Sequence, residues 1–159
     1  MLNLSDGLLP VAKHRASIEE VRRAFVENAP FREQRDRLWN TFLVYRSLIL
    51  DVIPNARFWV DGGFVTHKEW AAPKDIDVCV LVVQRDLEGV DASFEDLLTR
   101  EDSAGRRVQP MGGLIDGFLV IRNNRASLQY WHEHWTNVTD QNGDLDPVRR
   151  KGYVEVIGE

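Results

Sequence analysis

The chain has 159 residues, of which 43% are hydrophobic and 28% are charged. This length corresponds to one domain of ordinary size, and the composition excludes a wholly disordered chain. The 25 acidic residues outnumber the 20 basic ones, so the net charge of −5 disfavours a broad surface for binding duplex nucleic acid. We therefore expect a single domain over residues 1–159.

Neither a membrane segment nor a disulfide is expected. No apolar run approaches the roughly 18 residues that span a bilayer. The first ten residues lack the basic and then apolar pattern of a secretory signal. The single cysteine, Cys79, excludes an internal disulfide and a multi-cysteine zinc site. These features favour a cytoplasmic protein with no membrane partner, and they leave its oligomeric state open.

The N-terminal third is expected to form two helices after an extended lead-in over residues 1–16. Ser17 and Glu20 have capping-box spacing, which predicts that the first helix starts at Ser17. Pro30 ends this helix, because a residue that precedes proline avoids helical geometry. The apolar spacing that follows predicts a longer helix from Phe31 to Val52.

The rest of the chain is expected to alternate between strands and helices. The expected elements are a strand at Ala56–Val60, a loop over 64–74, a strand at Asp75–Val83, a short helix from Asp91 or Ser93 to Arg100, a strand at Leu114–Ile121, a helix from about Asn124, a polar loop over 137–150 and a strand at Gly152–Ile157. The order of these elements predicts an α+β fold, with a small mixed sheet flanked by helices.

One motif indicates chemistry. Gly62-Gly63 ends a predicted strand, and Asp75-Ile76-Asp77-Val78 opens the next one after eleven intervening residues. Side chains alternate along a strand, so Asp75 and Asp77 face the same way and can share Mg²⁺, which prefers oxygen ligands. The glycine pair lets backbone N–H groups approach an anion. The motif therefore predicts a site for a nucleoside triphosphate with two Mg²⁺ ions, which would neutralise the leaving pyrophosphate and activate an attacking hydroxyl. The alternative is a glycine turn beside two solvated aspartates.

On this motif the sequence resembles the DNA polymerase beta-type nucleotidyltransferase superfamily in its short, minimal form. The matching stretch is Trp59-Val60-Asp61-Gly62-Gly63-Phe64-Val65-Thr66, followed by Asp75-Ile76-Asp77-Val78. It is similar to small bacterial and phage-borne members of that superfamily. The resemblance implies transfer of a nucleoside monophosphate from a nucleoside triphosphate to a hydroxyl of RNA, a protein or a small molecule. By analogy, the setting would be a toxin–antitoxin or phage-conflict system.

The resemblance also implies roles for individual residues. Asp75 and Asp77 would be metal ligands, and Gly62-Gly63 would hold the β- and γ-phosphates. Family members place a third carboxylate on a later strand, where it completes the metal site and helps to deprotonate the acceptor. Asp116 is the candidate, because it lies in an otherwise apolar strand. The alternative is that Asp116 caps the turn after Gly112-Gly113 or faces solvent.

Basic residues near the motif are candidates for triphosphate contact. Lys68, Lys74 and His67 lie between its two halves, and Lys74 adjoins Asp75. Two basic clusters, Arg106-Arg107 and Arg149-Arg150-Lys151, are interpreted as solvated faces. The alternative is that they contact RNA or the phosphate tail.

Two positions depart from the family pattern. Gly63 stands where serine is common, and Asp61 stands where an apolar residue is usual and is assigned no role. The alternative function is therefore a catalytically inactive nucleotidyltransferase-fold module that binds a nucleotide or a partner protein.

Overall fold

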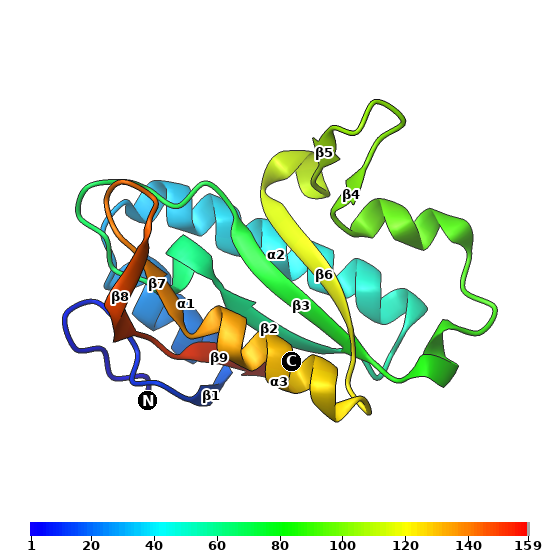
Figure 1. Ribbon diagram of the computed structural model, residues 1–159, viewed down its shortest axis with the longest axis horizontal. Coiled ribbons are helices and arrows are strands. Elements are labelled where there is room, and N and C mark those ends of the chain that lie inside the picture. The colour runs from blue at the N-terminus through cyan, green and yellow to red at the C-terminus, as the bar shows by residue number, and fades with distance from the viewer. Residues whose placement is uncertain (159) are drawn as a thin grey trace.

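The computed structural model describes residues 1–158 and contains a five-stranded mixed sheet (Figure 1). The strand order is β1 (Lys13–Ser17), β9 (Tyr153–Ile157), β2 (Arg57–Asp61), β3 (Ile76–Val82) and β6 (Ile115–Ile121). The pairs β1–β9 and β3–β6 are parallel, and the two pairs that involve β2 are antiparallel. The predicted α+β class with a mixed sheet is confirmed at this level.

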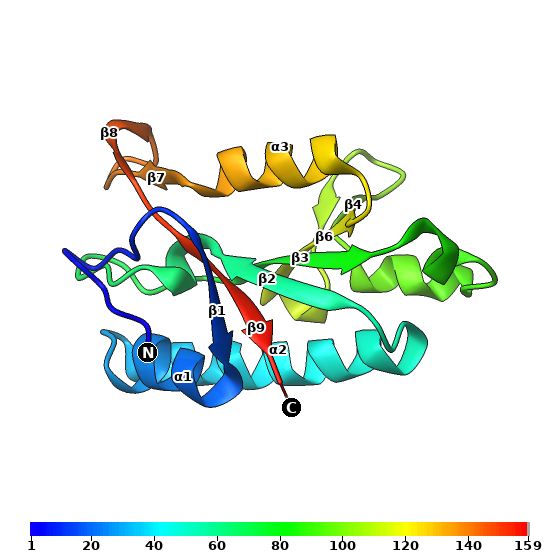
Figure 2. The same ribbon diagram turned by 90° about the horizontal axis from the view of Figure 1, so that it is seen from below.

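The sheet lies between helices on both faces, as Figure 2 shows. The long helix α2 (Arg32–Val52) covers one face together with α1 (Ile18–Arg22), and α3 (Arg125–Trp135) covers part of the other. The buried face of α2 presents Leu38, Trp39, Phe42, Tyr45 and Ile49 to the core. These positions follow the helical spacing of the sequence, so burial of this apolar stripe stabilises the helix on the sheet.

The predicted start of the first helix is confirmed. The Ser17 hydroxyl accepts from the Glu20 backbone N–H at 3.2 Å, and the Glu20 carboxylate accepts from the Ser17 N–H at 3.0 Å. After α1 the chain continues as one π-helical turn, Arg23–Glu27, and α2 then starts one residue later than predicted. Phe31 precedes α2 with a left-handed backbone.

Two segments that were not predicted as strands are strands. Residues 13–16 belong to β1, and the polar loop over 137–150 is a hairpin of β7 (Asn137–Thr139) and β8 (Leu145–Arg150). Residues of β8 are almost all exposed, and β1 buries little of its length at the edge of the sheet. Strands that bury so few side chains need no apolar alternation, so neither segment carries the pattern that identifies strands in a sequence.

The segment between β3 and β6 is built from short turns. The predicted helix from Asp91 or Ser93 is a 3₁₀ segment, Ala92–Leu97, capped by Asp91, which accepts from the Ser93 N–H at 2.8 Å. A small hairpin of β4 (Arg100–Glu101) and β5 (Arg107–Val108) follows. This hairpin brings Arg107 to the end of the sheet where the predicted motif lies.

None of the helices within residues 1–158 has the length and apolar character needed to cross a membrane.

Candidate functional site

Three aspartates lie side by side at one end of the sheet. Asp61 of β2 is the direct register partner of Asp77 of β3, and Asp77 is the direct partner of Asp116 of β6. Direct partners on neighbouring strands project from the same face, with Cβ atoms about 5 Å apart. We call Asp61, Asp77 and Asp116 the acidic row.

The acidic row lines a cavity of about 450 Å³. From the sheet and the loops beside it come Asp61, Gly62, Gly63, Thr66, Lys68, Asp77, Arg107, Asp116, Phe118 and Lys151. From α3 and the β7–β8 hairpin come His134, Trp135, Asn137, Val138, Thr139 and Leu145. The cavity therefore has a charged floor at the strand ends and a mixed wall formed by the second half of the chain.

Gly62 brings the backbone against the central aspartate. Its φ of +77° is left-handed, and a Cβ atom at this position would overlap Oδ2 of Asp77. Both facts require glycine at this position. A Cβ atom at Gly63 would have Nζ of Lys68 as its nearest side-chain nitrogen, at 3.8 Å. The glycine turn thus lies against Asp77, with Lys68 close to Gly63.

Asp77 has the most perturbed acidity in the row. Burial, together with the charges of Asp75, Asp61 and Asp116, raises the pKa of Asp77 to about 7 against the opposing effect of Lys151. Within residues 1–158, no side chain donates a hydrogen bond to the Asp77 carboxylate or pairs with it. A carboxyl group in a cavity with such a pKa is typical of functional sites.

Asp61, to which the sequence assigned no role, forms a buried ion pair. Nζ of Lys151 lies 2.6 Å from Oδ1 of Asp61, and each side chain is 6% exposed. The same ammonium donates to the Gly62 carbonyl at 2.9 Å and to the Thr66 hydroxyl at 3.3 Å. Burial raises the pKa of Asp61 to about 6 against the opposing effect of Lys151.

The interpretation of residues 149–151 as a solvated face is therefore wrong for Lys151. The chain turns inward between β8 and β9, which buries this lysine beside Asp61. Arg149 and Arg150 stay exposed.

Asp116 is buried and engaged at both oxygens. Its Oδ1 accepts from the Thr99 hydroxyl at 2.6 Å, and its Oδ2 pairs with the guanidinium of Arg107. Asp116 is 5% exposed, so it does not face solvent, and its hydrogen bonds do not go to the turn at Gly112-Gly113. Arg107 is 58% exposed, so this partner can leave without unfolding the site.

Asp75 and Lys74 lie outside the lining of the cavity. Asp75 precedes β3 and accepts from Nε2 of Gln109 at 2.9 Å, and it does not line the cavity. Lys74 is exposed and also does not line it. His67 is turned toward the helices, where its ring bonds the Ala24 carbonyl at 2.8 Å. Lys68 is the one candidate cation of that loop that reaches the cavity.

Arg35, which the sequence analysis missed, binds the glycine turn without lining the cavity. It is fully buried on α2, and its guanidinium donates to the carbonyls of Phe64 and Thr66, both at 2.6 Å. A signal was available, because Arg35 precedes Leu38 and Trp39 by three and four residues and so lies on the buried face of the helix.

In the part of the chain that the structure describes, no group of three or more His, Cys, Asp or Glu side chains is arranged to hold a metal ion. The donor chemistry nevertheless suits a hard cation. Asp77 offers carboxylate oxygens without a competing partner, and Asp75 stands two residues away.

Comparison with known proteins gives a family and no function. A family model described as "Family of unknown function (DUF6932)" matches residues 2–157, so the chain belongs to this family. No curated protein and no solved structure matches the chain.

Proposed function

We propose that the protein is a Mg²⁺-dependent nucleotidyltransferase of the nucleotidyltransferase-fold type. It would move a nucleoside monophosphate from a nucleoside triphosphate to an acceptor hydroxyl. The observation that carries the proposal is the contact between the Gly62 turn and Asp77, with Asp116 beside Asp77 in register. A backbone turn that accommodates phosphate, next to carboxylates that accommodate Mg²⁺, suits a metal-bound triphosphate.

The triphosphate would lie along Gly62-Gly63, with Lys68 supplying a cation to its phosphate oxygens. Burial, and after it the charges of Lys151 and Arg35, lowers the pKa of Lys68, while Asp77 opposes the shift. Asp77 would hold Mg²⁺ together with Asp75, once the latter is released from Gln109. Bound Mg²⁺ would neutralise charge on the triphosphate and on the pyrophosphate that leaves.

Asp116 would accept the proton of the acceptor hydroxyl. The hydroxyl oxygen would form a bond to the α-phosphorus, the bond to pyrophosphate would break, and the proton would pass to the Asp116 carboxylate. This role requires that Arg107 leave Oδ2 of Asp116, which its exposure permits. A released Arg107 would then be free to contact the phosphates.

The main alternative is a module that binds a nucleotide without chemistry. One observation favours it: Thr99 and Arg107 occupy the two oxygens of Asp116, so no free carboxylate stands ready as a base. In such a module the cavity and the Gly62 turn would still accept a triphosphate.

A thermal unfolding series tests whether the site binds its proposed ligand. Each nucleoside triphosphate would be added with and without Mg²⁺ to the wild type, to Asp77→Asn and to the exposed control Asp51→Asn. A ligand at 100 times its Kd stabilises the folded state by about 2.7 kcal/mol. We expect a Mg²⁺-dependent shift in the wild type and the control that Asp77→Asn loses. If no triphosphate stabilises the wild type, both functions fail.

A transfer assay then separates the two functions. Triphosphates labelled at the α-phosphate would be offered with RNA, protein and small-molecule acceptors. Label transfer that Asp116→Asn abolishes, with binding retained, supports the enzyme. Binding without release of pyrophosphate under any of these conditions supports the module.

A further inference from the structure

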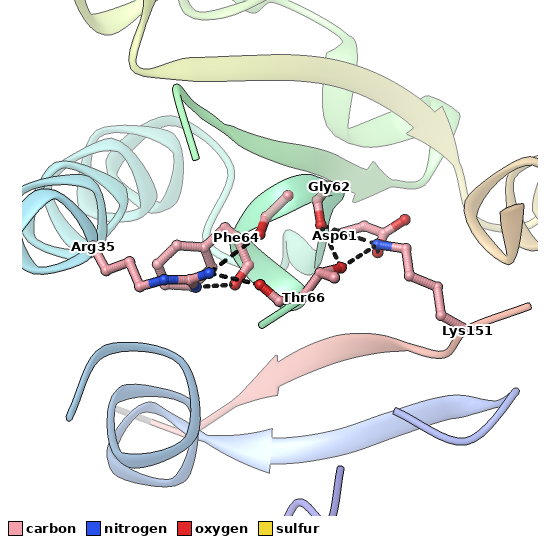
Figure 3. A network of polar contacts seen from close by, with 7 residues as sticks. Arg35, Asp61, Gly62, Phe64, Thr66 and Lys151 are labelled. Atoms are coloured by element: carbon pink, nitrogen blue, oxygen red, sulfur yellow. Dashed lines mark hydrogen bonds and ion pairs between the residues drawn. The ribbon is translucent and has the colours of Figure 1, made fainter. Parts of the chain in front are cut away.

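Two buried cations approach the glycine turn from opposite sides, as Figure 3 shows. Arg35 reaches it from α2, and Lys151 reaches it from the segment between β8 and β9. Neither residue belongs to the motif that suggested the function. Together they account for most of the polar bonds that the turn's carbonyl groups make.

Arg35 ties the turn to the N-terminal helices. Besides the carbonyls of Phe64 and Thr66, its guanidinium donates to those of Pro30 at 2.7 Å and Phe25 at 3.1 Å. Burial lowers the pKa of Arg35 to about 10, so it is cationic at neutral pH. Among residues 1–158 no carboxylate pairs with it, and its charge is balanced by carbonyl oxygens alone.

Lys151 holds the other side of the same segment. Its three bonds go to Asp61, to the Gly62 carbonyl and to the Thr66 hydroxyl, which uses every donor that an ammonium has. Thr66 is therefore held by both cations, through its carbonyl by Arg35 and through its hydroxyl by Lys151.

Burying a cation in a protein core carries a large desolvation penalty. Replacing buried charges by apolar side chains of similar volume is often neutral or stabilising, so stability alone does not explain two of them on one turn. Their specific effect is on the carbonyl oxygens of Gly62, Phe64 and Thr66. Free carbonyl oxygens would repel a phosphate, whereas here each one is already bound to a cation.

We infer that Arg35 and Lys151 are positioning residues for the triphosphate. They fix the backbone of residues 62–66 and bind the carbonyl oxygens of Gly62, Phe64 and Thr66, so the turn presents a favourable surface to an anion. The inference rests on the proposed function, and it assigns affinity for phosphate to two side chains outside the Gly62-Gly63 and Asp75–Asp77 motif.

Conservative and neutral variants test this role. Arg35→Lys keeps the charge but cannot reach carbonyls on both sides of its pocket, and Lys151→Met removes the ammonium. Arg37→Lys, at an exposed position of the same helix, is the matched control. Asp61→Asn/Lys151→Met removes both charges of the pair and serves as the variant that folds if Lys151→Met does not.

The readouts are the Kd values of each Mg²⁺-bound nucleoside triphosphate, of Mg²⁺-bound inorganic tripolyphosphate and of Mn²⁺ alone. We expect Arg35→Lys and each Lys151 variant to weaken both phosphate ligands at least tenfold, and by the same factor. Mn²⁺ affinity should change less than twofold in Arg35→Lys, because Asp75 and Asp77 are intact. The same is expected of Asp61→Asn/Lys151→Met, because the opposing effects of Asp61 and Lys151 on Asp77 are removed together. A merely structural role would lower Mn²⁺ and phosphate affinity together.

The outcomes separate the inference from the function on which it rests. Tight triphosphate binding by the wild type and by folded Arg35 and Lys151 variants alike would overturn the inference and leave the function standing. Equal loss of Mn²⁺ and triphosphate binding would also overturn it. A folded wild type that binds neither triphosphate nor tripolyphosphate would overturn the function, and the inference with it.

Discussion

The two outer members of the acidic row each have a cationic partner, but the partners differ in their access to solvent. Lys151, which pairs with Asp61, is 6% exposed and also binds the Gly62 turn. Arg107, which pairs with Asp116, is 58% exposed and lies on a two-residue strand. One pair is thus part of the fold, whereas the other is an ion pair that a ligand can displace. Asp77 lies between them with a raised pKa and without a partner within residues 1–158.

This difference predicts that removing Lys151 lowers the free energy of unfolding more than removing Arg107 does. Lys151→Met leaves the Asp61 carboxylate buried and unpaired, and we expect the free energy of unfolding at pH 7.5 to fall by about 3 kcal/mol. The loss is at the lower end for a broken buried pair because Asp61 can take up a proton. Arg107→Met should cost less than about 1 kcal/mol. Urea denaturation of both variants measures this, and equal losses would remove the distinction between the two pairs.

Removing the charge of Asp77, at the centre of the acidic row, should instead increase the free energy of unfolding. The folded state binds the Asp77 proton more tightly than the unfolded chain does, so ionisation of Asp77 lowers stability as the pH rises from about 4 to about 7. The raised pKa sets an upper limit of about 4 kcal/mol on this cost.

We expect Asp77→Asn to increase the free energy of unfolding by about 2 kcal/mol at pH 8.5, since a buried amide still carries some desolvation cost. The gain should vanish near pH 4, where the wild type is protonated. Denaturation of wild type, Asp77→Asn and the control Asp51→Asn at both pH values tests the sign. A variant less stable than the wild type at pH 8.5 would show that Asp77 has a stabilising partner.

Gly62 and Gly63 are adjacent in the turn, but only Gly62 lies against the Asp77 carboxylate. Gly62→Ala places a side chain at a left-handed φ and against the Asp77 carboxylate, so it should cost about 1–2 kcal/mol of stability and displace Asp77. Gly63→Ala meets nothing closer than 3.8 Å and should cost less than about 0.5 kcal/mol. Thermal unfolding with and without Mg²⁺-bound triphosphate compares them. If the triphosphate stabilises Gly62→Ala and Gly63→Ala equally, the close approach of Gly62 to Asp77 has no consequence for binding.

The sequence was sufficient for the elements that bury an apolar face. The spacing of Leu38, Phe42 and Ile49 predicted α2, and the apolar run after Asp77 predicted β3. It was insufficient for β1 and for the β7–β8 hairpin, because strands that bury few side chains need no apolar pattern. The single-domain expectation, the residue roles and the nucleotidyltransferase resemblance stay predictions.

The arrangement of the site depended on pairing that a sequence pattern does not encode. Alternation within one strand predicted a common face for Asp75 and Asp77, whereas Asp75 precedes β3 and does not line the cavity. Only strand register sets Asp61 and Asp116 beside Asp77. Lys151 was missed for a related reason. Its neighbours Arg149 and Arg150 are exposed, and charge patterning alone does not show which member of a basic run turns inward.

The smallest predicted effect concerns the coupling between Arg107 and Asp116. A double-mutant cycle of Arg107→Met and Asp116→Asn should give an interaction free energy of about 0.5 kcal/mol, which shrinks as salt is added, because the arginine is exposed to solvent. The equivalent cycle for Lys151→Met and Asp61→Asn should be larger and insensitive to salt, because both groups are buried. Urea denaturation at low and high ionic strength measures both couplings. A large, salt-independent coupling for Arg107 and Asp116 would mean that Asp116 is locked in its ion pair, which favours the binding module over the enzyme. A small one leaves Asp116 free to accept a proton when substrate arrives.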